Sequence, residues 1–348
     1  MKFLYNRVNG EILREKLAKN RENRITLSFY KYHCLRNPEF FRDHLYILMN
    51  QLGVLGRIYV AREGINAQIS LPAHQLEAFK KELEGIDFLR DVRLNFAIKD
   101  DGKSFFKLKI KTRNKIVADG ISDDGFDATR SGRRLNAMEF NSLASLRDTV
   151  IVDMRNHYES EVGHFQGALL PGANTFREIL LNAKKMLEPY REKNIILYCT
   201  GGIRCEKASA YFRHLGYPKV YQLDGGIIHY AREVETHQLE NHFIGKNFVF
   251  DERMGERITE HIIARCHQCG KPCDQHTNCR NAECNLLFIQ CDECHQKMEG
   301  CCSEACREVI HLSPGEQKTK RKGRYSGLKI YSANAEAFSL LNASNENH

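Results

Sequence analysis

A cysteine that is followed by two glycines and an arginine gives this chain its clearest candidate for chemistry. The apolar run at 195–198 is typical of a short buried strand that ends at Cys199, and apolar residues recur at helical spacing over 206–215. The glycines permit a tight turn whose amides point inward, and the following helix N-terminus adds partial positive charge. These amides and Arg204 are expected to lower the pKa of Cys199 and to make its thiolate a nucleophile. A purely structural buried cysteine is the alternative interpretation, and the adjacent glycines and arginine argue against it. The other loop residues are Thr200, Gly201, Gly202, Ile203 and Cys205.

A second set of reactive residues marks off a metal-binding module, because ten of the 13 cysteines fall between positions 266 and 306. Two Cys-x-x-Cys pairs allow both sulfurs of each pair to reach one metal ion. Eight or more thiolates would hold two structural Zn²⁺ ions, although thiolate ligation alone leaves iron open. Free or disulfide-linked thiols are the competing interpretation, which a cytoplasmic location disfavours. The candidate ligands are Cys266, Cys269, Cys273, Cys279, Cys284, Cys291, Cys294, Cys301, Cys302 and Cys306, for which His267, His276 or His295 could substitute.

A run of cations at every second position indicates a basic surface. Alternate side chains of a strand share one face, so the segment 107–115 would present a wholly basic face, with Leu108 and Ile110 on the other. Lysines that protect a solvated strand edge are the alternative interpretation. A second basic run at 318–324 favours phosphate contacts and an RNA partner. The candidate RNA-binding residues are Lys107, Lys109, Lys111, Arg113, Lys115, Lys320, Arg321 and Lys322.

Length and charge limit the classes to which the chain can belong. Its 348 residues suffice for two or three domains, each with its own core. The net charge of +8 permits a polyanionic partner without requiring one. No N-terminal segment is typical of a secretory leader, and no apolar run approaches the length of a membrane span. A cytoplasmic protein is therefore expected, in which many cysteines indicate metal binding or redox chemistry rather than disulfides.

The elements that position these residues follow two patterns, of which the first is a ferredoxin-like α+β arrangement. Its predicted order is strand, helix, strand, strand, helix, strand. This fold alone says nothing about function. The expected strands cover 25–30, 57–61, 65–71 and 92–98, and the expected helices cover 38–52 and 74–83.

The second pattern alternates buried strands with helices, which predicts a parallel α/β sheet covered by helices on both faces. Loops at the carboxyl ends of such strands form the ligand crevice, and Cys199 lies at one of these ends. The predicted helices cover 136–146, 158–161, 176–187, 205–215 and 227–236, and a further strand is expected at 247–250. The predicted domains are an N-terminal extension (1–22), a ferredoxin-like domain (23–118), a linker and helix (119–145), the α/β domain (146–240), a small Cys-rich metal-binding module (241–312) and a basic, flexible tail (313–348).

The loop at 199–204 resembles the active-site loop of rhodanese domains. The segment 150–155 is similar to that family's strand ending in Asp-x-Arg, which implies a structural, salt-bridged role for Asp153 and Arg155. The segments 163–168 and 220–227 are similar to the family's Gly-His-Ile-x-Gly-Ala motif and to its closing strand with a Gly-Gly turn. The resemblance therefore implies a rhodanese-like domain in which Cys199 and Arg204 are the catalytic residues.

The chain also departs from the usual rhodanese pattern. Cys205 stands where the family usually has Ser, and the Trp that usually follows the last Gly-Gly is missing. Four residues separate Cys199 from Arg204, one fewer than in the related phosphatases. A shorter ring of amides suits a sulfur atom better than a tetrahedral phosphate, so a phosphatase is disfavoured.

The three regions together resemble the bacterial rhodanese-containing tRNA uridine hydroxylases over 25–306. The resemblance implies oxygen-dependent conversion of the wobble uridine of certain tRNAs to 5-hydroxyuridine, with O₂ as co-substrate and Cys199 as the essential cysteine. The basic strand and tail agree with a tRNA partner independently of this resemblance.

Several interpretations of the chemistry stay open. No flavin or nicotinamide motif is found, nor a His, His, carboxylate set with a defensible spacing. Cys199 could add to C6 of the uracil and make C5 electron-rich, or it could carry a persulfide with Cys205 as a resolving thiol. A sulfurtransferase for tRNA thiolation or small-molecule sulfur transfer is the second functional hypothesis. A non-catalytic RNA-binding protein is the third, and the intact loop from Cys199 to Arg204 argues against it.

Overall fold

The computed structural model describes residues 4, 8–19, 22–98, 100, 102–122, 125–322 and 329–331. The chain divides into two compact units. The first comprises Met1–His157, Phe165–Phe243 and Asn247–Ile258, and the second comprises Tyr158–His164, Ile244–Lys246 and Thr259–His348. The end of the tail, which the sequence predicts to be flexible, lies outside the described residues. Within the described part, no helix is long and apolar enough to cross a membrane.

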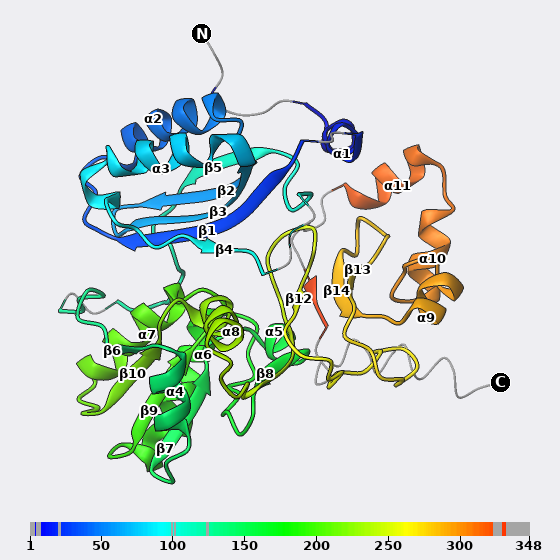
Figure 1. The fold of residues 1–348 in the computed structure, drawn as a ribbon. Coiled ribbons are helices and arrows are strands. Elements are labelled where there is room, and N and C mark those ends of the chain that lie inside the picture. The colour runs from blue at the N-terminus through cyan, green and yellow to red at the C-terminus, as the bar shows by residue number, and fades with distance from the viewer. Residues whose placement is uncertain are drawn as a thin grey trace. The chain divides into compact units, whose positions relative to one another are not determined.

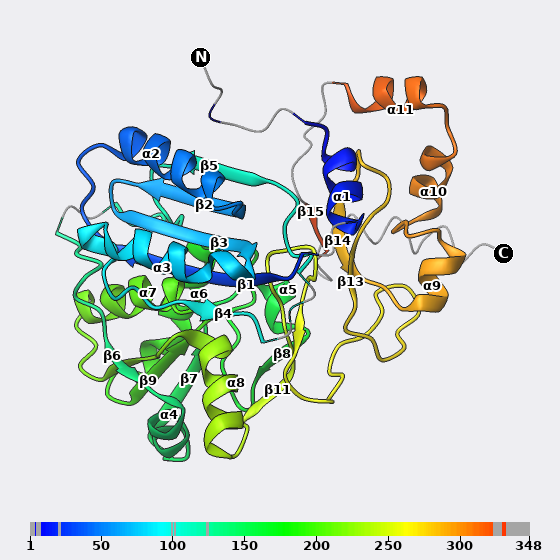
Figure 2. The ribbon, with the colours of Figure 1, turned by 45° about the horizontal axis from the view of Figure 1, so that its top comes forward.

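The N-terminal part of the first unit is a five-stranded sheet with two helices on one face (Figures 1 and 2). The strand order in the sheet is β4-β1-β3-β2-β5. Along the chain, β1 to β4 occur with α2 and α3 in the predicted order of strand, helix, strand, strand, helix, strand. The ferredoxin-like fold is therefore confirmed, and β5 extends it as an edge strand parallel to β2. The elements are α1 (Gly10–Lys19), β1 (Arg24–Tyr32), α2 (Pro38–Gln51), β2 (Leu55–Ala61), β3 (Gly64–Pro72), η1 (Ala73–Gln75), α3 (Leu76–Glu84), η2 (Asp87–Leu89), β4 (Asn95–Phe96) and β5 (Leu108–Thr112).

Alternation along β1 decides which face of this sheet is buried. Leu27 and Phe29 lie in the core beneath α2 and α3, whereas Ser28 and Tyr30 lie on the opposite, polar face. The polar face is the one that contributes to the site described below.

The strand expected at 92–98 is shorter in the structure. It pairs with β1 only at Asn95 and Phe96, because the N–H of Thr26 donates to the Asp100 carboxylate instead of to the Ala97 carbonyl, which would continue the ladder. Sequence periodicity could not show this long-range hydrogen bond.

The central part of the first unit is a four-stranded sheet in the order β6-β10-β9-β7, and all of its neighbouring strands are parallel. Residues of α6 and α7 pack on one face of the sheet, and residues of α4 and α8 pack on the other. The predicted parallel α/β architecture is therefore confirmed. The elements are β6 (Arg133–Leu135), α4 (Ala137–Ala144), β7 (Thr149–Asp153), α6 (Phe176–Leu187), η3 (Glu188–Tyr190), β9 (Asn194–Tyr198), α7 (Ile203–His214), β10 (Val220–Leu223) and α8 (Gly226–His237).

Two local expectations are wrong. The segment 119–145 was expected to be a linker with one helix, but it also contains β6, a strand too short and too rich in arginine to show periodicity. The strand expected at 247–250 lies earlier, at β11 (Phe243–Asn247), because Val249 and Phe250 leave the sheet to line a cavity. A three-stranded sheet has the order β12-β11-β8. Its other strands and a nearby short helix are β8 (Gly163–Phe165), β12 (Glu256–Arg257) and α5 (His157–Ser160).

The second unit has a small sheet and short helices around buried cysteines. β14 pairs antiparallel with β13 and parallel with β15. The buried Phe288 of β14 packs in one cluster with three buried cysteines, Cys279, Cys301 and Cys302. Helix α11 occupies the start of the segment expected to be a flexible tail, because Ser313 and Glu316 form a capping box at its N-terminus. The elements are β13 (His276–Asn278), β14 (Leu286–Ile289), α9 (Asp292–Lys297), α10 (Glu304–Ile310), α11 (Pro314–Arg321) and β15 (Lys329–Ile330).

Candidate active site and metal centres

Cys199 is fully buried directly after β9, and the turn that follows it curls its backbone around the sulfur. The N–H of Gly202 donates to the Cys199 Sγ at 3.2 Å. Gly202 has a φ of +99°, and a Cβ at this position would lie 2.9 Å from the Tyr30 hydroxyl, so only glycine fits without strain. Helix α7 begins at the next residue and directs its partially positive N-terminus at the loop.

The electrostatics of the loop favour the thiolate form of Cys199. Burial alone would raise the pKa of this thiol. The hydrogen bond from the Cys205 thiol, the Arg204 charge and the backbone N–H groups of Cys205 and Gly202 outweigh burial and lower the pKa to about 6. Burial and the neighbouring Cys199 raise the pKa of Cys205 well above its usual range, so this thiol keeps its proton. Cys199 is therefore a thiolate at neutral pH.

Arg204 is the cation of this loop, and it is only 8 % exposed. Its Nη2 donates to the Thr200 hydroxyl at 3.1 Å, and its guanidinium carbon lies 5.8 Å from the centre of the Phe250 ring. A cation held in a poorly hydrated place acts more strongly on nearby charge than it would in water. Arg204 can therefore stabilise both the thiolate and an anion that develops on a bound molecule.

The second Gly-Gly turn packs directly against the cysteine loop. The N–H groups of Ile227 and Ile228, in the first turn of α8, donate to the carbonyls of Cys199 and Thr200 at 3.0 and 3.2 Å. A Cβ on Gly226 would lie 2.5 Å from the Cys199 carbonyl oxygen, so a larger residue would displace the loop. The two motifs therefore form one structural unit.

An ion pair at the end of β7 supports the strand that carries the cysteine. Arg155 Nη2 lies 2.6 Å from Asp153 Oδ2, and both side chains are fully buried. The hydroxyl of Tyr198, the residue before Cys199, donates to the same oxygen at 2.7 Å. These contacts suit the structural role that the rhodanese resemblance implies for Asp153 and Arg155.

Side chains of the ferredoxin-like sheet hydrogen-bond the segment around Cys199, which the sequence did not predict. Tyr30 donates to Glu206 of α7 at 2.8 Å, Tyr32 donates to the first carbonyl of α7 at 3.1 Å, and Asn95 donates to the Gly201 carbonyl at 3.3 Å. Their only sequence signal is a polar position in a strand, which any solvent-facing residue shares. The active loop is thus held by both domains of the first unit.

A buried ion network also joins these domains. Lys207 of α7 is 1 % exposed and lies 2.7 Å from Glu63 and 2.6 Å from Asp119. Asp119 also contacts Lys115 at 2.6 Å. Lys115, the last cation of the expected basic face, is therefore partly exposed and already paired with a buried carboxylate.

A cavity of about 310 Å³ connects the cysteine loop with the polar face of the ferredoxin-like sheet. Cys199, Gly201 and Arg204 line it from the α/β domain, and Phe250 and Glu256 line it from the segment after β11. Its volume lies at the lower end of the range for small-ligand sites. The sheet contributes Ser28, Tyr30, Arg57, Tyr59, Asn66 and Gln68.

The basic residues of β5 continue the lining of this cavity toward the sheet edge. Arg57 and Tyr59 of β2 line the cavity, and they pair in register with Lys109 and Lys111 of β5. Paired residues of neighbouring strands point to the same face, so both lysines share the cavity face. Burial and the surrounding cations lower the pKa of Lys109, as expected where positive charges crowd.

The other candidate RNA-binding residues lie in different surroundings. Arg113 is exposed, with its guanidinium carbon 5.4 Å from the centre of the Tyr59 ring, and Lys107 lies over the Phe106 ring. In the second unit, exposed cations lie at and just after the end of α11, namely Lys320, Arg321 and Lys322.

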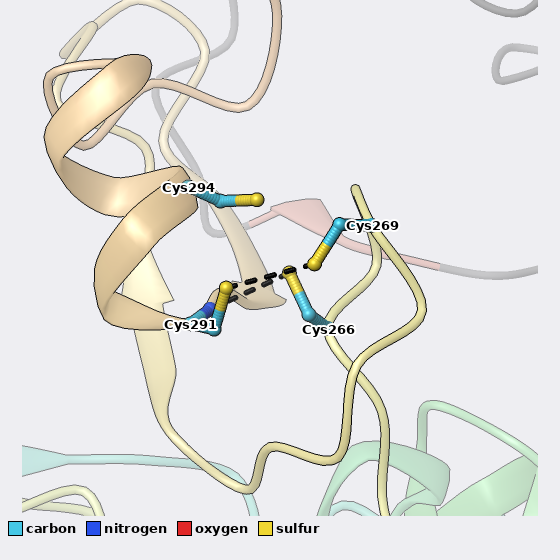
Figure 3. A group of neighbouring side chains, drawn as sticks. All are labelled: Cys266, Cys269, Cys291 and Cys294. Carbon is cyan, nitrogen blue, oxygen red and sulfur yellow. Dashed lines mark hydrogen bonds between the residues drawn. The ribbon is translucent and has the colours of Figure 1, made fainter.

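Eight cysteines of the second unit form two groups of four that could each hold a metal ion. Figure 3 shows the first group, in which Cys266 and Cys269 come from one loop and Cys291 and Cys294 from the start of α9. Cys269 Sγ lies 3.6 Å from Cys291 Sγ. The second group consists of Cys279, Cys284, Cys302 and Cys306, and in each group all sulfurs lie within 4.8 Å of one another.

Three family descriptions match successive parts of the chain: "UPF0176 acylphosphatase like domain" at 24–116, "Rhodanese-like domain" at 136–233 and "Rhodanase C-terminal" at 244–307. The tRNA uridine(34) hydroxylases of Photorhabdus laumondii and Pectobacterium atrosepticum are 53% and 55% identical to it over 332 residues, which cover 95% of this chain and 94% of each relative. That of Yersinia pestis is 54% identical over the same length. The chain belongs to the tRNA uridine(34) hydroxylase family.

Membership in the hydroxylase family confirms the resemblance drawn from the sequence. The rhodanese-like match begins at residue 136, earlier than the predicted domain start at 146. The structure agrees with the earlier start, because β6 and α4 pack into the α/β domain.

Two of the ten candidate ligands of this hydroxylase family member lie outside both metal groups. Cys273 accepts the N–H of Gln275 at 3.4 Å, and Cys301 is fully buried in the small core beside Phe288. The three candidate histidines join neither group among the described residues; His267 instead lies 2.9 Å from Glu161. Spacing in the sequence identifies the pairs of cysteines but not which pairs share an ion.

Proposed function

We propose that this protein hydroxylates C5 of the wobble uridine of tRNA, with O₂ as the oxygen donor and the Cys199 thiolate as the reacting group of the protein. The observation that carries the proposal is the cavity, which contains the low-pKa thiolate and extends toward a basic strand edge. The relatives are named for a uridine at position 34 of tRNA. A nucleotide substrate agrees with both the cavity and its basic surroundings.

Cys199 can activate the uracil ring by addition to C6. The sulfur–C6 bond forms as the C5–C6 electron pair moves toward C5 and O4, and Arg204 stabilises the resulting negative charge. C5 then carries enough electron density to react with the oxidant. The overall reaction consumes one O₂, two electrons from a reductant and two protons, and it releases one water molecule. Loss of the C5 proton restores the C5–C6 double bond as the Cys199 thiolate leaves C6.

The RNA backbone is held by the basic strand edge. Lys109 and Lys111 bind phosphates beside the target nucleotide, while the unpaired base enters the cavity past Arg57 and Tyr59. A base in an anticodon loop needs little energy to leave its stack, which suits a site that must reach C5 and C6. A tRNA substrate also supports a cytoplasmic location, which we propose and in which the thiols would stay reduced.

We assign one Zn²⁺ ion to each group of four cysteines. A tetrahedron with Zn–S bonds of about 2.3 Å has sulfur–sulfur separations of about 3.8 Å. Cys284 and Cys302 are 3.6 Å apart, and Cys302 and Cys306 are 3.8 Å apart. Four thiolates fill the coordination of the ion, so its role is structural: it links loops of a unit whose strands are short.

A sulfurtransferase is the second candidate function. The same loop amides and Arg204 would stabilise a persulfide on Cys199, and the Cys205 thiol is hydrogen-bonded to that sulfur. This function predicts changes in thiolated rather than hydroxylated nucleosides.

Nucleosides from a strain that lacks this protein test the two functions together. Mass spectrometry is expected to show loss of 5-hydroxyuridine derivatives, with recovery by the wild type but not by Cys199→Ala. A selective change in thiolated nucleosides would replace the hydroxylase proposal with the sulfurtransferase. Unchanged nucleosides would refute both hydroxylation and thiolation of tRNA, and would leave sulfur transfer to small molecules as the function to test.

A further inference from the structure

A buried carboxylate lines the same cavity as Cys199. Glu256, the first residue of β12, is 2 % exposed. Its Oε1 accepts the N–H of Ile98 at 3.0 Å and Nη1 of Arg253 at 2.5 Å. Its Oε2 is equally buried and has no hydrogen-bond partner among the described residues. A buried carboxylate oxygen without a donor is costly, so this atom is suited to accept a hydrogen bond from a bound molecule.

The surroundings of Glu256 fix which of its oxygens is free. Arg253 bridges Glu256 and Asp251, and it donates to Asp251 through Nε at 2.9 Å and Nη2 at 2.6 Å. Both oxygens of Asp251 are therefore occupied, although this residue also lines the cavity. Oε2 of Glu256 is the carboxylate oxygen that these contacts leave for a ligand.

We infer that Oε2 of Glu256 accepts the N3–H of the uracil and thereby selects uridine over cytidine, an inference that rests on the proposed function. Uracil carries a hydrogen on N3, whereas N3 of cytosine is an acceptor and repels a carboxylate oxygen. N3 also lies across the ring from C6. A base that presents C6 to the Cys199 sulfur therefore directs N3–H toward a different part of the cavity lining.

The other polar groups of the cavity discriminate less. The amides of Asn66 and Gln68 each offer both a donor and an acceptor, so they can pair with either pyrimidine. An ionised carboxylate can only accept. Burial raises the pKa of Glu256, whereas the Arg253 charge and the hydrogen bonds from Arg253 and the Ile98 N–H favour its ionised form. Glu256 therefore discriminates between uracil and cytosine more strictly than the amides of Asn66 and Gln68 do.

Glu256→Gln reverses the polarity of the free position with little change of shape. The donors from Ile98 and Arg253 hold the amide oxygen in the place of Oε1, so the amide NH₂ occupies the place of Oε2. A donor then faces N3–H. On an anticodon stem–loop RNA with uridine at position 34, kcat/KM is expected to fall about 10- to 100-fold. Glu252→Gln is the matched control, because Glu252 is exposed and forms an ion pair with the exposed Arg14 at the surface, and its kcat/KM is expected to stay at the wild-type value.

Binding separates this inference from the proposed reaction. In a Cys199→Ala background, affinities for stem–loops with uridine or cytidine at position 34 are measured with and without Glu256→Gln. The preference for uridine is expected to fall at least about 10-fold, and Glu256→Ala is expected to remove the preference without reversing it. Thermal unfolding shows whether each variant is folded.

A folded Glu256→Gln protein with an unchanged uridine preference would overturn the inference. The preference would then not depend on an acceptor at the position of Oε2. That result would leave the proposed hydroxylation standing. Conversely, a wild-type protein that prefers uridine through Glu256 but forms no 5-hydroxyuridine would retain the inference and refute the proposed function.

Discussion

The hydroxyl of Tyr30 on strand β1 donates a hydrogen bond of 2.8 Å to Glu206 on helix α7. Tyr30 lines the cavity of the ferredoxin-like sheet, and α7 is the helix whose N-terminus follows the Cys199 loop. Arg134 lies 2.9 Å from the same carboxylate oxygen. The position of the thiolate therefore depends on a domain that supplies none of the loop itself.

Tyr30→Phe removes this hydrogen bond and keeps the ring. Because Glu206 retains Arg134, the free energy of unfolding is expected to fall by only about 1 kcal/mol, while kcat/KM falls several-fold as the loop loses one restraint. Thermal unfolding and steady-state kinetics measure the two effects. Tyr190→Phe, at a partly buried tyrosine outside the cavity, is the control. Equal kinetics of Tyr30→Phe and the wild type would show that the contact does not position the loop.

The reactivity of Cys199 is expected to follow a thiolate with a pKa of about 6. Its rate of alkylation by iodoacetamide rises as the pH passes through about 6 and is constant above about 7.5, because the thiolate is then fully formed. The hydroxylation rate is expected to rise with pH over the same range. Arg204→Met removes a positive charge and moves the midpoint to higher pH.

Peptide-level mass spectrometry follows Cys199 separately from the other cysteines, and the exposed Cys34 reports the reagent's own behaviour. A wild-type midpoint near the unperturbed value of about 8.5 would contradict the proposed electrostatic role of the loop.

The positions of Cys199 and Arg204 in a turn between a strand and a helix could be predicted from the sequence, because a buried strand, a glycine turn and a helix are all encoded within one short segment. Their catalytic role stays a prediction. The parallel sheet around them follows from strong local periodicity in the same way. Tyr30, Asn95 and Glu256 could not be predicted, since their roles arise from contacts between segments far apart in the chain. The grouping of the cysteines could not be predicted for the same reason, because spacing alone neither assigns them to ions nor excludes Cys273 or Cys301.

The basic strand edge is expected to contribute affinity through phosphates. Lys109→Glu combined with Lys111→Glu should weaken tRNA binding strongly and reduce the slope of log K against log salt by about two, one for each lost phosphate contact. Lys81→Glu combined with Lys185→Glu has the same change in net charge on exposed helical positions and serves as the control. Affinities are measured over a range of salt concentrations. If the two double variants bind tRNA equally well, Lys109 and Lys111 protect the strand edge and do not contact phosphates.

The two metal groups predict how the metal content changes with single substitutions. Cys266→Ser and Cys284→Ser should each lower the content from two Zn²⁺ ions per chain toward one, because each removes one of four ligands. Cys273→Ser should retain both ions. Elemental analysis of the purified proteins measures the content. A loss of metal in Cys273→Ser, or its retention in both ligand variants, would contradict the assignment.

Removal of the metal ions should lower the stability of the second unit, because the ions have a structural role and not a catalytic one. A chelator is expected to lower the unfolding temperature of the second unit, since metal binding contributes to folding in units with small cores. Limited proteolysis should then cleave first within 259–322, and a cleavage pattern unaffected by the chelator would argue against a structural role for the metal.

Incorporation of labelled oxygen tests the central claim most directly. Purified protein is incubated under ¹⁸O₂ with tRNA that carries an unmodified uridine at position 34, and the nucleosides are analysed by mass spectrometry. Wild-type protein is expected to produce 5-hydroxyuridine with one ¹⁸O atom, and Cys199→Ser is expected to produce none. A product that takes its oxygen from water, or a fully active Cys199→Ser protein, would contradict oxygen-dependent hydroxylation through the Cys199 thiolate.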